Sequence, residues 1–508
     1  MIDSIVKTYQ HQTPARLAFG SGLIIGLAFP PMPWPWLAWF GLVPLIHSLR
    51  KAESPSNGAW LGFVWAMGFL PVVIYWMALN SGTVWWASLV SMIAAVLFLS
   101  LNYAFLGLWF TWFRGKWGKF AELLLPAMWL SVELVRTYGV LGFPWISLAN
   151  TQADYLYLIQ NAEYTGIYGI TFWVVAVNVC LANLNLIKPI KIIPVTLLVI
   201  VCPWLTGYGL LPEVPAGTLR VGIVQPNTNP LEKWNPEIRR QHFDQLARLT
   251  EEAAQQNPRL VVWPEAATPA YLRRGGRAYL AEIKDQLGEL ALTVVTGMPA
   301  YTRNGDGTRN YYNSVGLIDS NGISQRYDKI HLVPFGEYIP LSNLMPSLKN
   351  LNLGQGNFNK GETYTAFELG DTRFGAEVCY ETTIPALNRR LVQNGAEFLV
   401  AVVNDAWFGI SSEQFQHTLQ YRYRAVELRR PVVRSANTGI SIVYDQAGHE
   451  IVRKGMGQEG VIVADIAPSS EQTFYLKYGN LLGWIILVTA TGFSIIAARV
   501  SQAGIKNA

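Results

Sequence analysis

Hydrophobic positions follow two different patterns along this chain. In residues 1–212 and again near the C-terminus they form long apolar runs, and from Ser54 to Phe113 there is no Asp, Glu, Lys or Arg. A helix that crosses a bilayer needs about 20 mostly apolar residues, because its backbone polar groups must be satisfied internally. The long runs therefore predict a membrane domain. Residues 218–468, where short apolar runs alternate with polar segments, predict a separate α/β domain outside the membrane.

The apolar runs predict about eight transmembrane helices. Seven lie in residues 1–212, and the eighth lies in residues 478–500. The first two are short and flanked by proline, and a cleaved signal peptide is the alternative interpretation of the first. The predicted spans are 16–30, 35–49, 59–79, 86–112, 120–136, 165–186, 192–210 and 480–499.

Basic residues between these spans indicate an orientation. If the spans alternate, eleven Lys and Arg residues fall on one side, and only Arg136 and Lys477 fall on the other. Short cytoplasmic loops carry an excess of Lys and Arg. The pattern predicts a multi-pass membrane protein with a cytoplasmic N-terminus and the α/β domain on the other side of the membrane.

The net charge adds little to this picture. The chain has 39 Lys and Arg against 34 Asp and Glu, a formal charge of +5, and residues 214–468 hold 26 of each. The excess therefore lies in loops that flank spans, so it does not indicate a nucleic-acid partner. Glu133, near the outer end of a span and beside Arg136, is a candidate functional carboxylate because charge is costly there. A structural ion pair or a snorkelling end is the alternative.

The middle region alternates strands and helices. Leu219–Gln225 predicts a buried strand, Pro236–Gln256 a helix, and Arg259–Trp263 a second strand. The same alternation continues to about residue 466, with the last predicted strands near 432–444 and 460–466. Short apolar runs separated by amphipathic helices are typical of a layered α/β sheet.

Cys379 is the only cysteine in this α/β domain. It follows an apparent strand, Arg373–Val378, and precedes a helix. A helix N-terminus favours negative charge and lowers the pKa of a nearby thiol, which would activate Cys379 as a nucleophile. A buried, inert cysteine is the alternative.

Two further strand ends carry groups that such a nucleophile needs. Glu265 follows the strand that ends in Trp263, and Lys329 follows a third strand, in the sequence RYDKIH. A carboxylate can act as the base, and an ammonium can stabilise an oxyanion. We expect strands of one sheet to present all three groups at the same rim.

The motifs around these residues carry a specific resemblance. WPE, YDKIHLVPFGE and GAEVCYE, in that order, resemble the nitrilase superfamily of carbon–nitrogen hydrolases, which uses a Glu–Lys–Cys triad on an αββα sandwich. This match covers residues 218–468. With seven spans before it and one after, the whole chain resembles the apolipoprotein N-acyltransferases, which are membrane-bound members of that superfamily. The segments GFPW and QYRYRAVELRRPVVRSANTG are similar to that family too.

The resemblance implies a role for each motif residue. Glu265 would be the general base, Lys329 would stabilise the tetrahedral intermediate, and Cys379 would carry the acyl group. Supporting or substrate-binding roles are implied for Glu337, Tyr380, Glu381, Trp234 and Asn313.

The implied reaction moves a fatty acyl chain from a phospholipid, through a Cys379 thioester, to the α-amino group of a diacylglyceryl-cysteine at a lipoprotein N-terminus. The implied partners are the phospholipid acyl donor, the diacylglyceryl-apolipoprotein acceptor and the lipid bilayer, with a monomeric enzyme. The resemblance also implies a multi-pass protein of a bacterial inner (cytoplasmic) membrane whose catalytic domain faces the periplasm. We expect no cofactor, and no metal because His331 and His417 lack partners at metal-ligand spacing.

Two other functions stay open on the sequence alone. A membrane-tethered nitrilase-type amidase acting on a small C–N substrate would use the same triad. A transporter with an external sensing domain would need polar residues within its spans or internal repeats, and Glu133 is the one such residue we identify.

Two segments have alternative interpretations. Loop 333–363 is rich in glycine and apolar residues and is either a lid that dips into lipid or a packed surface loop. A run of arginines is either a phospholipid headgroup site or a solvated helix face with ion pairs. The arginines are Arg422, Arg424, Arg429, Arg430 and Arg434.

Overall fold

The computed structural model describes residues 12–184, 186–273, 275–340 and 357–506. The chain divides into two compact units. The first, unit 1, comprises residues 1–78, 89–211 and 480–508 and is helical; the second, unit 2, comprises residues 79–88 and 212–479 and holds all the strands that the described residues form.

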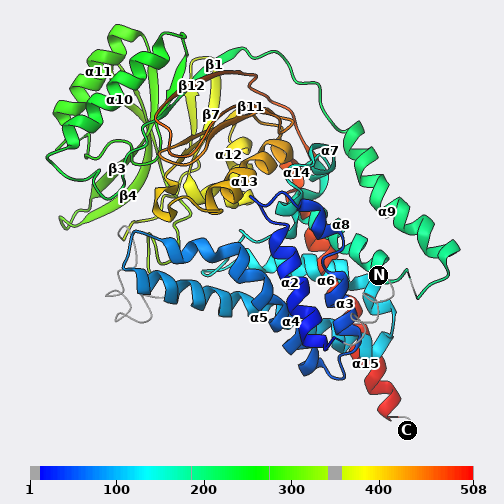
Figure 1. The fold of residues 1–508 in the computed structure, drawn as a ribbon. Helices are drawn as coiled ribbons and strands as arrows, with labels where there is room; N and C mark the ends of the chain where they lie inside the picture. The colour runs from blue at the N-terminus through cyan, green and yellow to red at the C-terminus, as the bar shows by residue number, and fades with distance from the viewer. Residues whose placement is uncertain (1–11, 185, 274, 341–356, 507–508) are drawn as a thin grey trace. The chain divides into compact units, whose positions relative to one another are not determined.

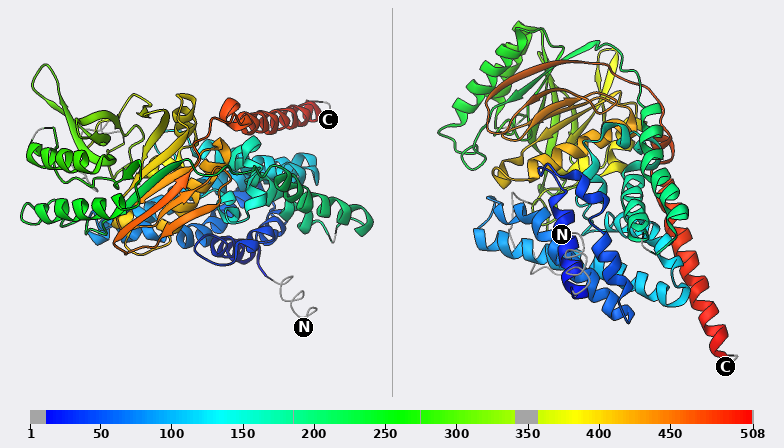
Figure 2. Two further views of the ribbon diagram at one scale, coloured as in Figure 1. Left: turned by 90° about the horizontal axis from the view of Figure 1, so that it is seen from above. Right: turned by 45° about the vertical axis from the view of Figure 1, so that its right-hand side comes forward.

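Unit 1 is built from apolar helices and short connecting turns. Its C-terminal helix is a single continuous rod, drawn in red in Figure 2. The helices are α2 (Pro14–Leu27), α3 (Val43–Arg50), α4 (Pro55–Ile74), α5 (Trp85–Trp117), α6 (Phe120–Arg136), α7 (Leu156–Ile159), α8 (Ala162–Ala182), α9 (Pro189–Gly209) and α15 (Leu481–Lys506), with 3₁₀ turns η1 (Pro35–Trp39), η2 (Tyr75–Leu79) and η3 (Leu148–Gln152).

Among the described residues, five helices are long and apolar enough to cross a membrane. They are Pro55–Leu79, Trp85–Trp117, Ala162–Ala182, Pro189–Gly209 and Leu481–Arg499. Helix α2 is apolar but shorter, and α6 has 17 residues. The prediction of one continuous helix over 35–49 is wrong, because η1 and the eight-residue α3 are separated by a turn at Phe40–Leu42.

Close backbone approaches hold the helices of unit 1 together. A Cβ atom at Gly62 of α4 would lie 2.0 Å from the carbonyl oxygen of Tyr103 in α5, so only glycine permits this contact. Small residues at helix interfaces are the usual device where lipid removes the hydrophobic driving force for association.

Glu133 does not form the ion pair with Arg136 that its position suggests. The Arg136 guanidinium instead donates to the hydroxyl of Tyr103 (3.0 Å) and to the carbonyl oxygen of Phe143 (3.3 Å). The Glu133 carboxylate accepts hydrogen bonds from uncharged groups, including the hydroxyls of Ser147 (2.6 Å) and Thr171 (2.8 Å).

Unit 2 contains two six-stranded sheets within its described residues. The first sheet has the order β12 (Gly460–Ile466), β1 (Leu219–Gln225), β2 (Leu260–Val262), β3 (Thr293–Arg303), β4 (Arg309–Asp319) and β5 (Gly322–Asp328). The second has the order β11 (Glu450–Lys454), β10 (Ser441–Tyr444), β9 (Val432–Ala436), β8 (Phe398–Val403), β7 (Thr372–Val378) and β6 (Ala366–Leu369).

The two sheets pack face to face between two layers of helices (Figure 1). A buried cluster that includes Val262 and Val315 of the first sheet and Val378 and Val400 of the second fills the space between them. Helices α10 (Arg239–Ala254) and α11 (Arg277–Leu290) lie side by side and cover the first sheet, while α12 (Pro385–Gln393) and α13 (Glu413–Leu428) cover the second. This is an αββα sandwich, as the resemblance implies.

The sequence missed or misread a few features of unit 2. Strand β11 was not predicted, and the strand expected over 432–444 is two strands, β9 and β10. The solvated helix face proposed for the arginine run is wrong, since Arg424, Arg429, Arg430 and Arg434 are all buried. Arg424 and Arg434 do form ion pairs, with Glu427 and Asp405. Residues 341–356 of the predicted lid loop lie outside the described residues.

Candidate active site

The three predicted catalytic residues follow the ends of three strands, but not of one sheet. Glu265 follows β2, and Lys329 follows β5, both in the first sheet, whereas Cys379 follows β7 in the second. The expectation that one sheet presents all three is therefore wrong. The sandwich brings them together because the two sheets face each other, and both Glu265 and Lys329 act electrostatically on the Cys379 thiol.

A tight turn places Glu265 beside β3. Residue Ala266 has a left-handed φ of 48°, and the amide of Gly297 on β3 donates to the carbonyl oxygen of Pro264 (3.2 Å). A Cβ atom at Gly297 would lie 2.5 Å from the Cα of Glu265, so the turn packs this closely only against glycine.

A chain of hydrogen bonds links Glu265 to Lys329. Asn313 of β4 donates from Nδ2 to Glu265 Oε1 (2.7 Å) and to Glu337 Oε1 (3.0 Å). Glu337 in turn forms an ion pair with Lys329, with 2.8 Å between Nζ and Oε2. All four side chains are buried. Asn313, for which the resemblance implies a supporting role, is thus the bridge between the two carboxylates.

Burial and these charges set the protonation of the site. Burial raises the pKa of Glu265 above its usual range, although nearby Lys329 opposes this shift. Despite its burial, Lys329 has a raised pKa because Glu337 and Glu265 stabilise its charge. Lys329 is therefore an ammonium, while Glu265 holds a proton more readily than an ordinary glutamate.

The predicted activation of the thiol by a helix N-terminus is wrong. Cys379 begins only the short 3₁₀ turn η5 (Cys379–Thr383) and has a left-handed φ of 50°. Burial, followed by the charge of Glu265, raises the pKa of the Cys379 thiol well above its usual value. The thiol is neutral at rest, so a base must remove its proton as the sulfur attacks.

Glu381 connects the nucleophile turn to the segment after β5. Its carboxylate accepts hydrogen bonds from the Tyr327 hydroxyl (2.8 Å) and from the backbone amides of Ile330 (2.8 Å), His331 (3.0 Å) and Val378 (2.9 Å). It therefore holds the strand that leads to Cys379 against the segment that carries Lys329. Tyr380 lies half-buried in the same turn.

Trp234 lies at the edge of this arrangement. Its ring is 45% exposed, and it makes no hydrogen bond or ring contact with the residues that the structure describes. Its neighbour Lys233 is buried, and its Nζ donates to the main-chain oxygen of Glu265 (3.4 Å). Burial lowers the pKa of Lys233 to about 8. Sequence reasoning missed this lysine, although it directly precedes Trp234.

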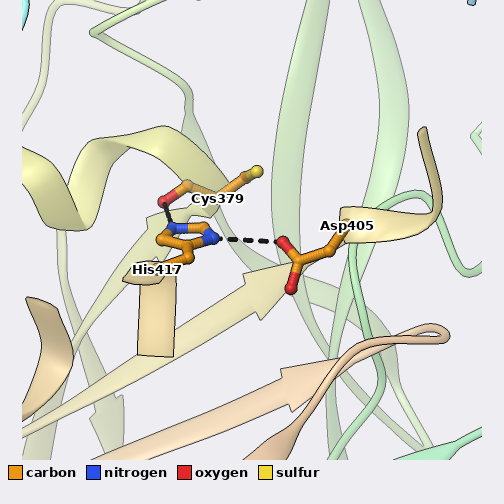
Figure 3. A group of neighbouring side chains, drawn as sticks. All are labelled: Cys379, Asp405 and His417. Carbon is orange, nitrogen blue, oxygen red and sulfur yellow. Dashed lines mark hydrogen bonds and ion pairs between the residues drawn. The ribbon is translucent and has the colours of Figure 1, made fainter. Parts of the chain in front are cut away.

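Sequence reasoning also missed a partner of His417. Cys379 Sγ, a carboxylate oxygen of Asp405 and a ring nitrogen of His417 lie within 4.8 Å of one another, at distances a metal ion could bridge. The ring nitrogens of His417, however, are bonded to Asp405 and to the Cys379 carbonyl oxygen (Figure 3). Despite burial, Asp405 raises the pKa of His417 to about 9. A protonated, doubly bonded imidazole does not suit a metal.

Two family models match this chain. The model described as carbon–nitrogen hydrolase matches residues 220–475, which are unit 2 from β1 onwards. The model described as apolipoprotein N-acyltransferase N-terminal domain matches residues 21–180, which are helices of unit 1 and their connections.

Curated relatives match over almost their full length. The apolipoprotein N-acyltransferase of Geobacter metallireducens is 34% identical and shares 95% of this chain and 95% of its own length. The chain belongs to the apolipoprotein N-acyltransferase family. Another family member, from Chlorobaculum tepidum, is 29% identical over 96% of both chains.

A solved structure is also similar to part of this apolipoprotein N-acyltransferase family member. An amidase from Nesterenkonia sp. is 18% identical, and the similarity covers 51% of this chain and 94% of the amidase with a TM-score of 0.38.

Proposed function

We propose that this protein is a phospholipid:apolipoprotein N-acyltransferase that works through a thioester on Cys379. The observation that carries the proposal is the relationship to an apolipoprotein N-acyltransferase at 34% identity over 95% of both chains. The arrangement of Glu265, Asn313, Glu337 and Lys329 around the thiol supports the assignment of roles.

In the first half-reaction, the Cys379 sulfur attacks the ester carbonyl carbon of a phospholipid while its proton passes to the Glu265 carboxylate. The Lys329 ammonium stabilises the oxyanion of the tetrahedral intermediate. The C–O bond to glycerol then breaks, and Glu265 returns the proton to the departing oxygen. The products are a lysophospholipid and an acyl thioester on Cys379.

In the second half-reaction, the neutral α-amine of the diacylglyceryl-cysteine attacks the thioester carbon. Glu265 accepts a proton from the amine, the C–S bond breaks, and the proton passes to the Cys379 sulfur. The amide product leaves with the acyl chain. A base with a raised pKa suits both steps, because it must accept and return one proton in each.

We further propose that unit 1 crosses a bacterial inner membrane eight times, with unit 2 in the periplasm and the protein a monomer. Five long apolar helices and the one-sided basic residues support the orientation. Reporter fusions at the N-terminus and after residue 212 would test it; a cytoplasmic signal from the second fusion would contradict it.

The function is tested with the purified full-length protein in detergent and a phospholipid whose acyl chain is isotopically labelled. We expect mass spectrometry to find the labelled acyl mass on the peptide that contains Cys379. Adding a diacylglyceryl-cysteine lipopeptide should remove that mass and produce the N-acylated lipopeptide. Cys379→Ser should form neither species.

The alternatives give different results. An amidase would hydrolyse a small amide substrate and would not transfer the label to the lipopeptide amine. A transporter would keep its activity in Cys379→Ala. Labelled enzyme that releases only free fatty acid, in the presence of the lipopeptide, would also contradict the acyltransferase assignment.

A further inference from the structure

Cys379 has a backbone conformation that needs support. Its φ of 50° lies in the left-handed region, which residues other than Gly, Asn and Asp seldom adopt. Such a conformation persists where surrounding contacts over-determine it. In this structure the contacts act on the Cys379 carbonyl oxygen, which accepts hydrogen bonds from His417 Nε2 (3.1 Å) and the Tyr421 hydroxyl (3.4 Å).

His417 is itself held by charged groups from two other elements. Its Nδ1 lies 3.0 Å from Asp405 Oδ1, in the turn η6 (Asp405–Phe408) after β8. The second Asp405 oxygen forms an ion pair with Arg434 of β9. Glu413, one turn earlier in α13, lies 3.5 Å from the same imidazole nitrogen.

The members of this group are closed off from solvent. The side chains of His417, Asp405 and Arg434 are fully buried. The guanidinium of Arg434 also stacks over the ring of Tyr421, 5.2 Å from its centroid. A buried network of charged side chains is stable only when they form hydrogen bonds and ion pairs with one another. Such a network holds its side chains in one arrangement.

The hydrogen bonds of this group reach the backbone of Cys379 and not its sulfur, although Cys379 Sγ lies within 4.8 Å of a His417 ring nitrogen and an Asp405 carboxylate oxygen. Figure 3 shows the Cys379 carbonyl oxygen directed at the His417 ring, while the sulfur points away from that ring. Both ring nitrogens of His417 are bonded to other groups, Asp405 and the Cys379 carbonyl oxygen, so His417 is not placed to take the thiol proton. Because the peptide group is planar, holding its carbonyl oxygen fixes the rotation of the whole Cys379–Tyr380 peptide.

We propose that His417, held by Asp405 and Arg434, is a positioning residue that fixes the Cys379–Tyr380 peptide and thereby aims the Cys379 sulfur at the acyl carbon between Glu265 and Lys329. This inference rests on the proposed function for its kinetic consequence. Its geometric consequence, a fixed thiol direction, does not depend on the substrate.

The test compares four variants of the full-length enzyme in detergent. His417→Leu removes the hydrogen-bond donor at similar volume, His417→Gln retains an amide donor without the charge, and Asp405→Asn keeps the shape of the anchor without its charge. The matched control is His449→Gln, because His449 makes the same type of contact with Asp445 (2.9 Å) in the turn between β10 and β11. The thermal midpoint of each variant establishes that it folds.

The main measurement is the rate of thioester formation on Cys379 at increasing phospholipid concentration. In His417→Leu we expect the rate at saturating phospholipid to fall about 100-fold, since a misplaced reacting group costs about that much. The KM for phospholipid should change less than about threefold, because the His417 network does not touch substrate. His417→Gln should form the thioester at least about tenfold faster than His417→Leu. The rate in Asp405→Asn should be about tenfold lower than in the unmodified enzyme, and the rate in His449→Gln should be unchanged.

A second measurement keeps the inference independent of the proposed function. Iodoacetamide alkylates Cys379 without phospholipid, and its rate should differ at least about fivefold between His417→Leu and His417→Gln while His449→Gln is unchanged. If the unmodified enzyme forms no thioester, the proposed function fails, and the alkylation rates still decide the role of His417. Two results would overturn the inference. One is an equal rate of thioester formation per folded molecule, at saturating phospholipid, in His417→Leu and the unmodified enzyme. The other is an equal rate of Cys379 alkylation in His417→Leu and His417→Gln.

Discussion

Glu133 in unit 1 and Glu265 in unit 2 are both buried, and their carboxylates have different hydrogen-bond partners. Glu133 in α6 accepts four hydrogen bonds, two on each oxygen: from the Trp129 indole (3.1 Å) and the Leu148 amide (3.0 Å) on one, and from the Ser147 and Thr171 hydroxyls on the other. In the part of the chain that the structure describes, Asn313 is the one side chain that donates a hydrogen bond to the Glu265 carboxylate.

The difference separates a structural carboxylate from a reactive one. The donors to Glu133 come from α6, from Ser147 and Leu148 at the start of η3, and from α8, so this residue ties three segments of unit 1 together. Among the described residues, by contrast, only one oxygen of the Glu265 carboxylate accepts a hydrogen bond, and this carboxylate lies near an ammonium and a thiol. Burial of an acid is therefore weak evidence of function. A buried carboxylate that has an oxygen free to accept a hydrogen bond, and that lies beside other titratable groups, is stronger evidence of a catalytic role.

The largest expected effect is the loss of catalysis in Glu265→Gln. The amide cannot accept the thiol proton, so we expect thioester formation to fall about 1,000-fold, within the usual range for a general base. The matched variant is Glu133→Gln, which should keep its rate within about threefold per folded molecule, because Glu133 does not contact the reacting groups. Mass spectrometry of the Cys379 peptide over time measures both rates. Equal losses in the two variants would contradict the comparison.

Removal of the Lys329 charge should have the next largest effect. In Lys329→Met we expect thioester formation to fall about 100-fold, because the oxyanion loses an ammonium partner. The pH profile should change as well. Lys329 lowers the pKa of Glu265, so its loss raises that pKa further, and the rate should begin to fall at a higher pH as the solution is acidified.

The rate of Lys329→Met measured across pH therefore tests the electrostatic part of this argument. Only the ionised Glu265 can accept the thiol proton, so the acid limb of the profile reports its pKa. Lys360→Met is a suitable control, because Lys360 lies over the ring of Tyr338 and has no ion pair with Glu265 or Glu337 among the described contacts. An unshifted acid limb in Lys329→Met would contradict the assignment of Glu265 as the base.

Much of this site was predictable from local patterns. Glu265, Lys329 and Cys379 each follow a strand within a distinctive motif, and strand ends place side chains at a rim. The sequence did not indicate which sheet each strand joins, because pairing is set by tertiary contacts. For the same reason Cys379 was expected in the sheet of Glu265, and it lies in the other.

Residues that act through distant partners were harder to identify. Asn313 and Glu337 are 24 positions apart, and His417 and Asp405 are 12 apart, so no local period links them. Arg434 was expected near solvent because arginine is seldom buried, yet Asp405 compensates its charge. An apolar surrounding sequence, VVRSA, was the available signal that Arg434 faces the interior.

A smaller effect is expected on the stability of Glu133→Gln. The amide cannot accept all four hydrogen bonds, and its NH₂ group would face donors. We expect a loss of about 2 kcal/mol in the free energy of unfolding. The thermal midpoint of the full-length protein in detergent should fall by about 4 °C. Glu53→Gln, at an exposed position, is the control for a general effect of removing an acid from unit 1, and an equal shift in that variant would contradict the structural role of Glu133.

The smallest expected effect comes from Lys233, whose buried ammonium lies beside the Glu265 backbone. Its pKa falls from 10.5 to about 8 in the folded protein. Between these values the unfolded chain binds more protons, so stability rises with pH through this window, and the cost of the buried charge is fully present below about pH 8.

Lys233→Met removes this cost and also removes the hydrogen bond to the Glu265 carbonyl oxygen. The two effects oppose each other, and we expect a net rise in the thermal midpoint of about 2 °C at pH 7. At pH 9.5 much of the folded-state lysine is already neutral, so the gain should shrink or reverse in sign. A gain that is equal at the two pH values would mean that Met stabilises by packing alone, and the charge of Lys233 would then have no part in the electrostatics around Glu265.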